Sequence, residues 1–223
     1  MSRMFSSIAS RYNLMNNVMT GFTHHLTRRF AFSLAKFKTG QRAVDLATGT
    51  GDFVKLLNAK GGEKSVVIGC DLSREMLGLA KKHNHRTDFI QADINTLPFL
   101  DNSFDLSTIS YGLRNVQDPL LVLTEIFRIT RPGGHLIIVE SSIPMNTGSR
   151  FLIWFHFTKI VPRLASFFRL STAAYNYYFE SVKQFPIGTR FFHLLRNAGW
   201  SHATWYTRLF GAVSIYLVTK GVS

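Results

Sequence analysis

Residues 40–140 alternate short apolar runs with stretches in which apolar residues recur at helical spacing. Five of these runs have the length expected of buried strands, and turn or helix signals bound each of them. The runs are Ala43–Ala47, Ser65–Cys70, Thr87–Gln91, Leu106–Ser110 and His135–Glu140. Strands that alternate with helices in this way predict βαβ units and a parallel sheet.

The chain ends with two further strand-like runs, Trp200–Tyr206 and Val213–Lys220, with Gly211 in the turn between them. Their proximity predicts an antiparallel hairpin at the end of the sheet. We therefore expect an α/β fold of the Rossmann-like kind, with a mostly parallel seven-stranded sheet. This outline is typical of class I methyltransferases. A dinucleotide dehydrogenase would usually need a second domain for its substrate.

The 223 residues suffice for one domain with a sizeable core, and two full domains would fit poorly. We find no repeat, linker or low-complexity tract. The expected division of this single domain is an N-terminal helical cap (1–39), a cofactor-binding core (40–140), a lid (141–185), and a C-terminal helix with the hairpin (186–223).

Composition narrows the class of protein and its compartment. The single cysteine, Cys70, excludes a disulfide framework, and it makes a reducing compartment such as the cytoplasm the expectation. Met1–Tyr12 lacks the apolar segment of a signal peptide. The strongly apolar patch Phe151–Phe157 is too short to span a bilayer. His83 and His85 have no further ligands nearby in sequence, so we predict no metal site.

Positive charge is concentrated in the two flanks of the chain. The 26 Lys and Arg residues exceed the 13 Asp and Glu residues, for a net charge of +13. Residues 1–42 contain no acid, and only Glu180 follows Glu140. Such asymmetry indicates an anionic neighbour, either phospholipid or nucleic acid. Selection for solubility is the alternative explanation.

A glycine-rich turn follows the first predicted strand, in the stretch from Val44 to Asp52, and a helical pattern begins at Phe53. Gly49 and Gly51 allow the backbone to turn tightly and to approach a ligand closely. Asp45, near the strand end, would meet an ammonium group, directly or through water. An ordinary strand–helix turn is the alternative.

Two acids follow the next two strands at the spacing that adenosine recognition requires. Asp71 is placed to accept hydrogen bonds from both ribose hydroxyls. Asp93 would accept from the adenine amino group, while the backbone N–H of Ile94 serves a ring nitrogen. NAD would explain Asp71 equally well, but Val54 replaces the third glycine of the dinucleotide motif. Together with Arg131–Gly134, a Pro-Gly-Gly turn into the fifth strand, these acids predict S-adenosylmethionine as cofactor.

Three segments carry a more specific resemblance. Residues 107–118 resemble the signature of the ubiquinone/menaquinone biosynthesis C-methyltransferase family, and residues 4–16 and 175–186 are similar to two further motifs of that family. The resemblance implies methylation of a ring carbon on a prenylated quinol: demethylmenaquinol, 2-methoxy-6-polyprenyl-1,4-benzoquinol, or both. By the family pattern, Thr50, Asp71, Asp93, Ile94 and Ser110 hold the cofactor.

This sequence departs from the family pattern at several positions. Ser10 and Asn13 stand where the family often has Pro and Asp, and Tyr178 stands where Leu is usual. The 141–170 segment is also more basic and aromatic than expected. These departures leave the choice of quinone open, because they lie near the predicted lid.

Methyl transfer to a quinol carbon requires positioning and a base that removes the hydroxyl or ring proton. Arg114, just beyond the fourth strand, is a candidate to stabilise a phenolate or to orient a water; an ion pair that ties the loop to the core is the alternative. Asn115 would hold a quinol oxygen. His24 and His25 are candidate bases, although a surface position on a helix is the simpler interpretation.

Tyr12, Tyr175 and Tyr177 are candidates to line the quinol pocket, and buried core tyrosines would give the same pattern. The segment Gly148–Leu170 interleaves aromatic and basic residues. Its aromatic residues are Phe151, Trp154, Phe155, Phe157, Phe167 and Phe168, and its basic residues include Arg150, Lys159, Arg163 and Arg169. Either an interfacial helix on anionic lipid, peripheral at the inner face of the membrane, or a lid packed over the active site would explain it.

Three rival functions remain. One is methylation of another lipophilic small molecule. A second is modification of nucleic acid, but the stretch Ser110–Leu113 lacks the Asn/Asp-Pro-Pro-Tyr/Phe motif of base amino methyltransferases, so we expect no nucleic-acid partner. The third is a cofactor-binding subunit without activity. The sequence is also compatible with a homodimer.

Overall fold

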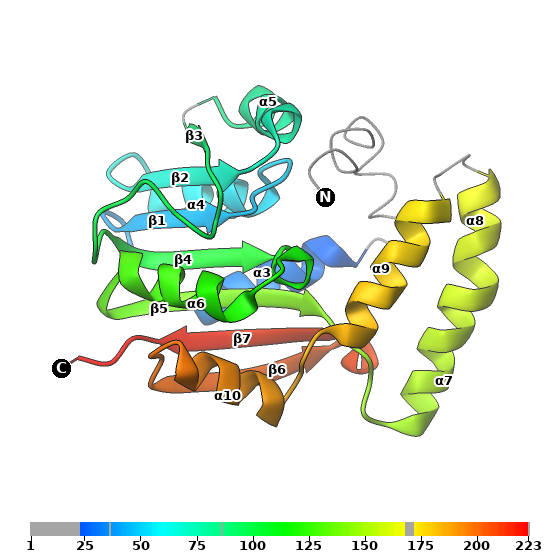
Figure 1. Cartoon of the computed structure of the whole chain (residues 1–223). Coiled ribbons are helices and arrows are strands. Elements are labelled where there is room, and N and C mark those ends of the chain that lie inside the picture. Colours follow the sequence, from blue (N-terminus) through cyan, green and yellow to red (C-terminus); the bar gives the residue numbers. More distant parts are fainter. Residues whose placement is uncertain (1–22, 36, 86, 168–171, 223) are drawn as a thin grey trace.

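The computed structural model describes residues 23–35, 37–85, 87–167 and 172–222. Its centre is a seven-stranded sheet with the order β3-β2-β1-β4-β5-β7-β6 (Figure 1). The first five strands are parallel to one another, and β7 runs antiparallel to both β5 and β6. The predicted α/β fold with a C-terminal antiparallel hairpin is therefore confirmed.

The strands are β1 (Arg42–Leu46), β2 (Val66–Asp71), β3 (Asp88–Gln91), β4 (Phe104–Ser110), β5 (Thr130–Ser141), β6 (His202–Arg208) and β7 (Val213–Thr219). The α-helices are α3 (His24–Leu34), α4 (Asp52–Gly61), α5 (Arg74–His83), α6 (Pro119–Ile129), α7 (Thr147–Phe155), α8 (Val161–Phe167), α9 (Thr172–Gln184) and α10 (Thr189–Asn197). Shorter helical segments are η2 (Leu113–Asn115), η3 (His156–Ile160) and η4 (Leu209–Gly211).

The largest departure from the sequence prediction is at Arg131–Gly134, which we expected to form a turn before the fifth strand. In the structure β5 begins at Thr130 and includes this segment, with an irregular register opposite β4. The reason is a second set of backbone partners. Gly133 N–H donates to the Lys220 carbonyl at 2.9 Å, and Lys220 N–H donates to the Gly134 carbonyl at 3.0 Å, so the chain after β7 continues the pairing.

Local sequence fixes several helix starts. Asp118 accepts hydrogen bonds from the backbone N–H groups of Leu120 and Leu121, and Pro119 occupies the first turn of α6. Ser73 accepts from the Met76 N–H at the start of α5. Both caps follow strands or loops at the carboxyl edge of the sheet, so they fix the loops at that edge.

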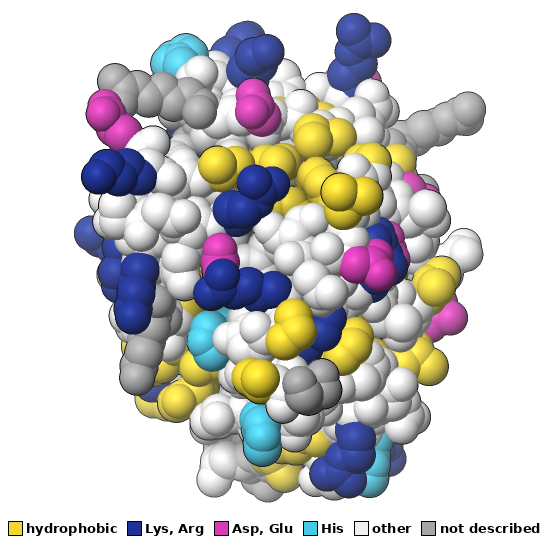
Figure 2. Space-filling view, turned by 90° about the vertical axis from the view of Figure 1, so that its left-hand side faces the viewer, with side chains coloured by type: hydrophobic (Ala, Val, Ile, Leu, Met, Phe, Trp, Pro, Cys, Tyr) yellow, Lys and Arg dark blue, Asp and Glu magenta, His cyan; other side chains and the backbone are white. Residues whose placement is uncertain are grey.

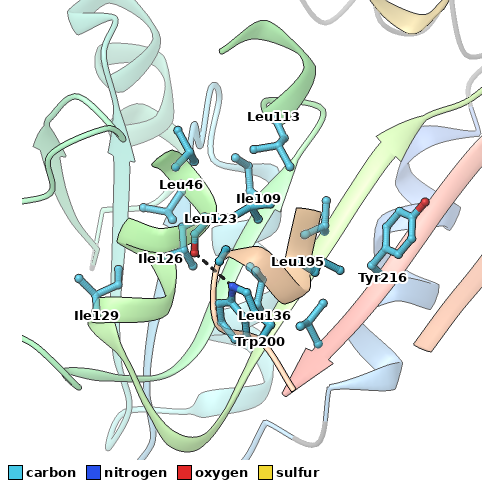
Figure 3. Close-up of a cluster of buried hydrophobic side chains, with 14 of the residues drawn as sticks. Leu46, Ile109, Leu113, Leu123, Ile126, Ile129, Leu136, Leu195, Trp200 and Tyr216 are labelled. Atoms are coloured by element: carbon cyan, nitrogen blue, oxygen red, sulfur yellow. Dashed lines mark hydrogen bonds between the residues drawn. The ribbon is translucent and has the colours of Figure 1, made fainter. Parts of the chain in front are cut away.

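Two apolar layers cover the sheet. On one face, residues of α6 and α10 pack against the strands, and the Trp200 indole N–H donates to the Leu123 carbonyl at 3.1 Å (Figure 3). On the other face, Phe32 of α3 and Phe53 and Leu57 of α4 pack against strand residues such as Ile137. The sheet is therefore buried on both faces, which explains the nearly continuous apolar strand sequences.

Helices α7, α8 and α9 stand beyond the carboxyl ends of the parallel strands, away from both sheet-covering layers (Figure 1). Between α7 and α8 the segment η3 is a π-helical turn, with Phe157 buried. Within the described residues, every helix is too short or too polar to cross a membrane.

Candidate active site

A cavity of about 620 Å³ opens at the carboxyl ends of β1, β2 and β4. Its size is typical of small-molecule sites, and its position at the strand ends is where open α/β sheets bind ligands. The residues that line it and matter for the argument are Gly49, Asp71, Asp93, Ile94, Ser110 and Asn115. All six were candidates from the sequence, so the fold brings residues from four separate segments to one site.

The glycine-rich turn has two sides with different surroundings. Gly49 has φ 55°, lines the cavity, and donates its backbone N–H to Asp71 Oδ2 at 2.8 Å. Gly51 has φ 78° and faces α5, where a Cβ atom would lie 2.7 Å from Asn84 Nδ2. Gly49 is thus placed for ligand approach. Gly51 permits close packing between the turn and α5.

Asp71 presents a carboxylate that is already oriented. Its Oδ2 accepts from Gly49 and its Oδ1 accepts from the Ser73 N–H at 2.9 Å. Burial raises the pKa of Asp71, and the backbone hydrogen bonds oppose that rise. Asp93 is more exposed, and its Oδ1 accepts from the backbone and side chain of Asn95. Both acids keep free acceptor positions toward the cavity.

Asp45 and Thr50 lie beneath the turn, outside the lining of the 620 Å³ cavity, beside a small adjoining hollow. Asp45 is buried and accepts hydrogen bonds at 2.6 Å from the hydroxyls of Thr48 and Thr108. Burial raises its pKa from 3.8 to about 6, against the effect of these hydrogen bonds. A contact with an ammonium group stays a prediction; the two threonines show that Asp45 also braces the turn.

An ion pair missed by the sequence reasoning joins α3 to the site. Arg28 donates to Asp52 at 2.7 Å and, through Nε, to Ser110 Oγ at 3.1 Å. Ser110 lines the cavity, so α3 helps to orient a residue of the cavity wall. The run of basic residues before β1 was the available signal, but it did not identify Arg28.

Arg114 does not line the cavity. Its guanidinium forms an ion pair with Glu140 and donates to the Tyr111 carbonyl at 2.8 Å, and its backbone N–H donates to Glu140 Oε2 at 3.2 Å. Glu140 has no exposed surface. The ion pair that we gave as the alternative for Arg114 is therefore present. Glu140 was missed as a site residue, although an acid that ends a buried strand was a usable signal.

Asn115, the neighbour of Arg114, reaches the cavity and is held from two sides. Its Oδ1 accepts from the Tyr177 hydroxyl at 3.0 Å, and its Nδ2 donates to the Tyr111 carbonyl at 3.2 Å. Tyr177 of α9 thus reaches the site through Asn115. Tyr111 also lines the cavity; its hydroxyl is buried, and no hydrogen-bond partner is found for it among the described residues.

The two histidines of α3 differ in environment. His24 is buried, so the surface interpretation is wrong for it, whereas His25 is exposed. Burial, together with Arg28 and His25, lowers the pKa of His24 from 6.5 to about 4. An imidazole with this pKa binds a proton weakly at neutral pH, which counts against His24 as the base. Ligand atoms of both histidines and Asp52 lie within 4.8 Å of one another, but the Arg28 guanidinium on Asp52 opposes a cation there.

Two candidates from the sequence fall outside what the structure describes. Tyr12 lies outside the described residues. Tyr175 lies on α9, but its side chain is also outside the described part of the chain. Their roles in the quinol pocket stay predictions. Tyr178, which the sequence singled out only as a departure from the family pattern, has its ring 4.9 Å from the Arg114 guanidinium.

The aromatic segment has an inner and an outer side. Phe157 is buried against Tyr178 and Phe179, so it is not part of an outward face. Phe151, Trp154 and Phe155 of α7 are 61%, 46% and 45% exposed. Each of the two explanations from the sequence, a lid and an interfacial helix, therefore matches a different side of the same segment.

Positive charge is not confined to this side of the molecule. Figure 2 shows the opposite face, at the left of Figure 1, where Lys and Arg side chains are spread over the surface with fewer acids between them. Charge alone therefore does not select a docking face.

Comparison with known sequences gives a consistent picture. The sequence profile of the ubiE/COQ5 methyltransferase family matches residues 1–220. A demethylmenaquinone methyltransferase from Paenarthrobacter aurescens is 36% identical over 217 residues, covering 97% of this chain and 85% of the relative. A ubiquinone/menaquinone biosynthesis C-methyltransferase from Rubrivivax gelatinosus is 36% identical over 223 residues, covering 99% and 87%.

Solved structures support the same fold at lower identity. A possible histamine N-methyltransferase from Thermotoga maritima, described as S-adenosylmethionine-dependent, has a TM-score of 0.65 and 20% identity, covering 99% of this chain and 100% of the other. A methyltransferase from Haemonchus contortus, in complex with phosphomonomethylethanolamine and S-adenosylhomocysteine, has a TM-score of 0.63 and 16% identity, covering 85% and 51%.

Proposed function

The chain belongs to the ubiE/COQ5 methyltransferase family, and on that basis we propose that it methylates a ring carbon of a prenylated quinol in menaquinone or ubiquinone biosynthesis. It is an S-adenosylmethionine-dependent enzyme. The proposed acceptors are demethylmenaquinol and 2-methoxy-6-polyprenyl-1,4-benzoquinol. The observation that carries the proposal is the cavity in which Asp71 and Asp93 lie beside Asn115, because cofactor and acceptor must meet there.

The cavity residues suit S-adenosylmethionine. Asp71 accepts backbone hydrogen bonds from Gly49, Ser73 and Leu72, and a carboxylate has about four lone-pair sites, so it can still accept from a ribose hydroxyl. Asp93 and Ile94 provide an acceptor and a donor for the adenine edge. Gly49 has no side chain, so the cofactor can approach the backbone closely at this position. When bound, the cofactor supplies a methyl group that is already activated by the positive sulfur.

Asn115 is the residue that we propose to contact the quinol. Its amide keeps one N–H and one oxygen lone pair after the bonds to Tyr111 and Tyr177, and both can meet a quinol oxygen. Arg114 acts as a positioning residue, since its guanidinium is held by Glu140 and the Tyr111 carbonyl behind Asn115. This pair fixes the loop that presents Asn115, and orientation of this kind lowers the barrier to transfer.

The first experiment is methyl transfer from radiolabelled S-adenosylmethionine to two reduced short-chain acceptors, a demethylmenaquinol and a methoxybenzoquinol. Label in either product supports the proposal, and the ratio identifies the pathway. If neither acceptor is labelled while cofactor binding is measurable by calorimetry, the quinol assignment is wrong. The assay would then move to other lipophilic phenols, the alternative that the exposed aromatic segment also fits.

We further propose that the enzyme works in the cytoplasm, docked on the inner face of the membrane through Phe151, Trp154 and Phe155. Lys159 and Arg163 follow on the next turns and are exposed, which favours anionic lipid. Substrates with isoprenoid tails reside in the bilayer, so docking would shorten their path to the site.

Sedimentation with vesicles rich in anionic lipid tests this docking. The variant F151S/W154S/F155S should lose most binding at low salt. Leu100→Ser is the matched control, because Leu100 is 84% exposed on a loop remote from α7 in sequence. Equal binding by both variants, or none by the unmodified protein, would reject the proposed surface.

A further inference from the structure

A second cavity, of about 200 Å³, lies between the inner side of the lid and the edge of the sheet. Its wall is mostly apolar and comes from five segments of the chain. The principal side chains are Ile143, Ile153, Phe157, Phe179, Val182 and Val213. An apolar cavity of about 150 Å³ already holds a benzene molecule, so this one has room for a somewhat larger apolar group.

Most of the polar side chains in this wall already have hydrogen-bond partners. Ser141 Oγ lies 2.7 Å from the Tyr178 hydroxyl, and Ser142 Oγ donates to the Gly211 carbonyl at 2.8 Å. Thr23 and His156 are the other polar lining residues among those described. Because the serines and the tyrosine already have partners, the cavity favours a hydrocarbon over a polar ligand.

Tyr178 and the Arg114–Glu140 ion pair separate this cavity from Asn115 and the reaction site. The Tyr178 ring is 5.5 Å from the Phe157 ring on the cavity side and 4.9 Å from the Arg114 guanidinium on the other. On the same helix, Tyr177 bonds to Asn115 in the cofactor cavity. A molecule with a polar ring at Asn115 and a chain leading away along α9 would therefore find this apolar space beyond Tyr178.

The other side of the cavity adjoins α7. Ile153 points inward to the Phe157 cluster, while its neighbours Phe151, Trp154 and Phe155 are exposed. The apolar space thus lies between the reaction site and the surface proposed to face the bilayer. A chain that starts in the membrane would have apolar surroundings along α7 and again in the cavity.

We propose that this cavity binds the first isoprenoid units of the acceptor's tail, which makes it a specificity site for prenylated rings. The inference rests on the proposed function, because it assumes that the acceptor carries such a tail. Its volume limits it to the units nearest the ring, so the remaining tail would stay outside, along α7. Recognition would then depend on the presence of a tail more than on its full length.

The test fills the cavity from α7. Ile153→Trp places a larger side chain in it, and Leu152→Trp makes the same type of change at a neighbouring position that is 57% exposed. Val182→Phe fills the cavity from α9 and serves as a second variant if Ile153→Trp does not fold. Circular dichroism and thermal melting establish folding for each protein.

Two readouts separate the tail site from methyl transfer. The first is binding of tritiated farnesol to the full chain by equilibrium dialysis, which requires no reaction. We expect at least a tenfold loss of farnesol affinity in Ile153→Trp or Val182→Phe, and less than a twofold change in Leu152→Trp. The second is the ratio of KM values for a farnesylated acceptor and the same ring without a tail, which should rise at least tenfold in the filled variants only.

Each outcome decides one of the two proposals. Farnesol binding with the expected variant pattern, but no methylation of any quinol, would leave the tail site standing and reject the function. Methylation with farnesol affinity and KM ratio unchanged by the filled variants would reject the tail site alone. Equal, competitive binding of dodecanol would also reject it, because the cavity would then take any linear chain.

Discussion

Arg114 forms an ion pair with Glu140, a carboxylate with no exposed surface, and so joins the loop after β4 to the end of β5. The Tyr178 ring covers the guanidinium at 4.9 Å and excludes water from the pair. Removing one partner of such a pair leaves an uncompensated charge in the interior, which is costly. The pair lies directly behind Asn115, so its loss should affect both stability and the chemistry.

Arg114→Ala should destabilise the protein by about 3 kcal/mol and abolish turnover, while S-adenosylmethionine still binds. The double variant Arg114→Met, Glu140→Gln removes both charges. It should recover much of the stability and remain inactive, because Asn115 is no longer held in place. Urea unfolding, calorimetry and the methyl-transfer assay measure the three quantities. Near-normal turnover in Arg114→Ala, or strictly additive losses of stability, would contradict this role.

Asp71 should contribute to cofactor affinity through its charge. In the unmodified protein both carboxylate oxygens of Asp71 accept from a backbone N–H, one from Gly49 and the other from Ser73. Asp71→Asn turns one of these oxygens into an NH₂ group, which cannot accept, so one of the two backbone N–H groups loses its partner. We expect the Kd for S-adenosylmethionine to rise at least about tenfold, since hydrogen bonds to charged groups are worth about 1.5–3 kcal/mol. Asp88→Asn is the control, because Asp88 is exposed at the start of β3. Similar affinities in both variants would remove Asp71 from the binding site.

Gly51 and Gly62 both have positive φ, 78° and 67°, but differ in their surroundings. A Cβ at Gly51 would lie 2.7 Å from Asn84 Nδ2 and 3.2 Å from Ala80 Cβ, whereas nothing lies within 4 Å at Gly62. Both alanine variants carry a backbone cost of about 1 kcal/mol. Gly51→Ala should lose about 2 kcal/mol more from overpacking.

Chemical unfolding of the two glycine variants measures this difference directly. Cofactor affinity should fall by less than threefold in Gly51→Ala, because the residue faces α5 and not the cavity. A large loss of affinity with normal stability would restore the interpretation from the sequence, in which Gly51 serves ligand approach.

The contrast between the two glycines shows how far sequence reasoning reaches. Strand-end positions follow from chain order, because parallel strands end at one edge; Asp71, Asp93 and Ser110 were therefore found without coordinates. The tertiary contacts of a residue do not follow from its neighbours in sequence. Gly51 and Gly49 are two residues apart, yet one packs on α5 and the other lines the cavity.

Partners that lie far apart in the chain were the main omission. Arg28 and Ser110 are separated by 82 positions, and Arg114 and Glu140 by 26. No local pattern links such residues, so Glu140 was seen only as the last acid of the central segment and the end of the fifth predicted strand. The burial of His24 was missed for the same reason, since Asp52, whose ligand atom lies within 4.8 Å of that of His24, belongs to α4.

Asp45 should give the stability of the cofactor-free protein an identifiable pH dependence. Its pKa is about 6 in the folded protein and 3.8 when unfolded, so between these values the folded state binds more protons. Stability from this group is therefore full below pH 4 and declines as the pH rises to 6. The expected loss is about 2 kcal/mol. His24, whose pKa falls from 6.5 to about 4, acts in the opposite direction over an overlapping range.

Urea midpoints between pH 4 and 7 separate the two groups when measured on Asp45→Asn and His24→Asn. Asn at position 45 should fold, because the hydroxyls of Thr48 and Thr108 can rotate to accept as well as donate. As the pH rises, the slope of stability against pH should be more positive in Asp45→Asn than in the unmodified protein, because only the His24 effect is left. It should be more negative in His24→Asn, because only the Asp45 effect is left. If Asp45→Asn follows the unmodified curve, Asp45 is already ionised below pH 4, and its burial does not control the charge beneath the glycine-rich turn.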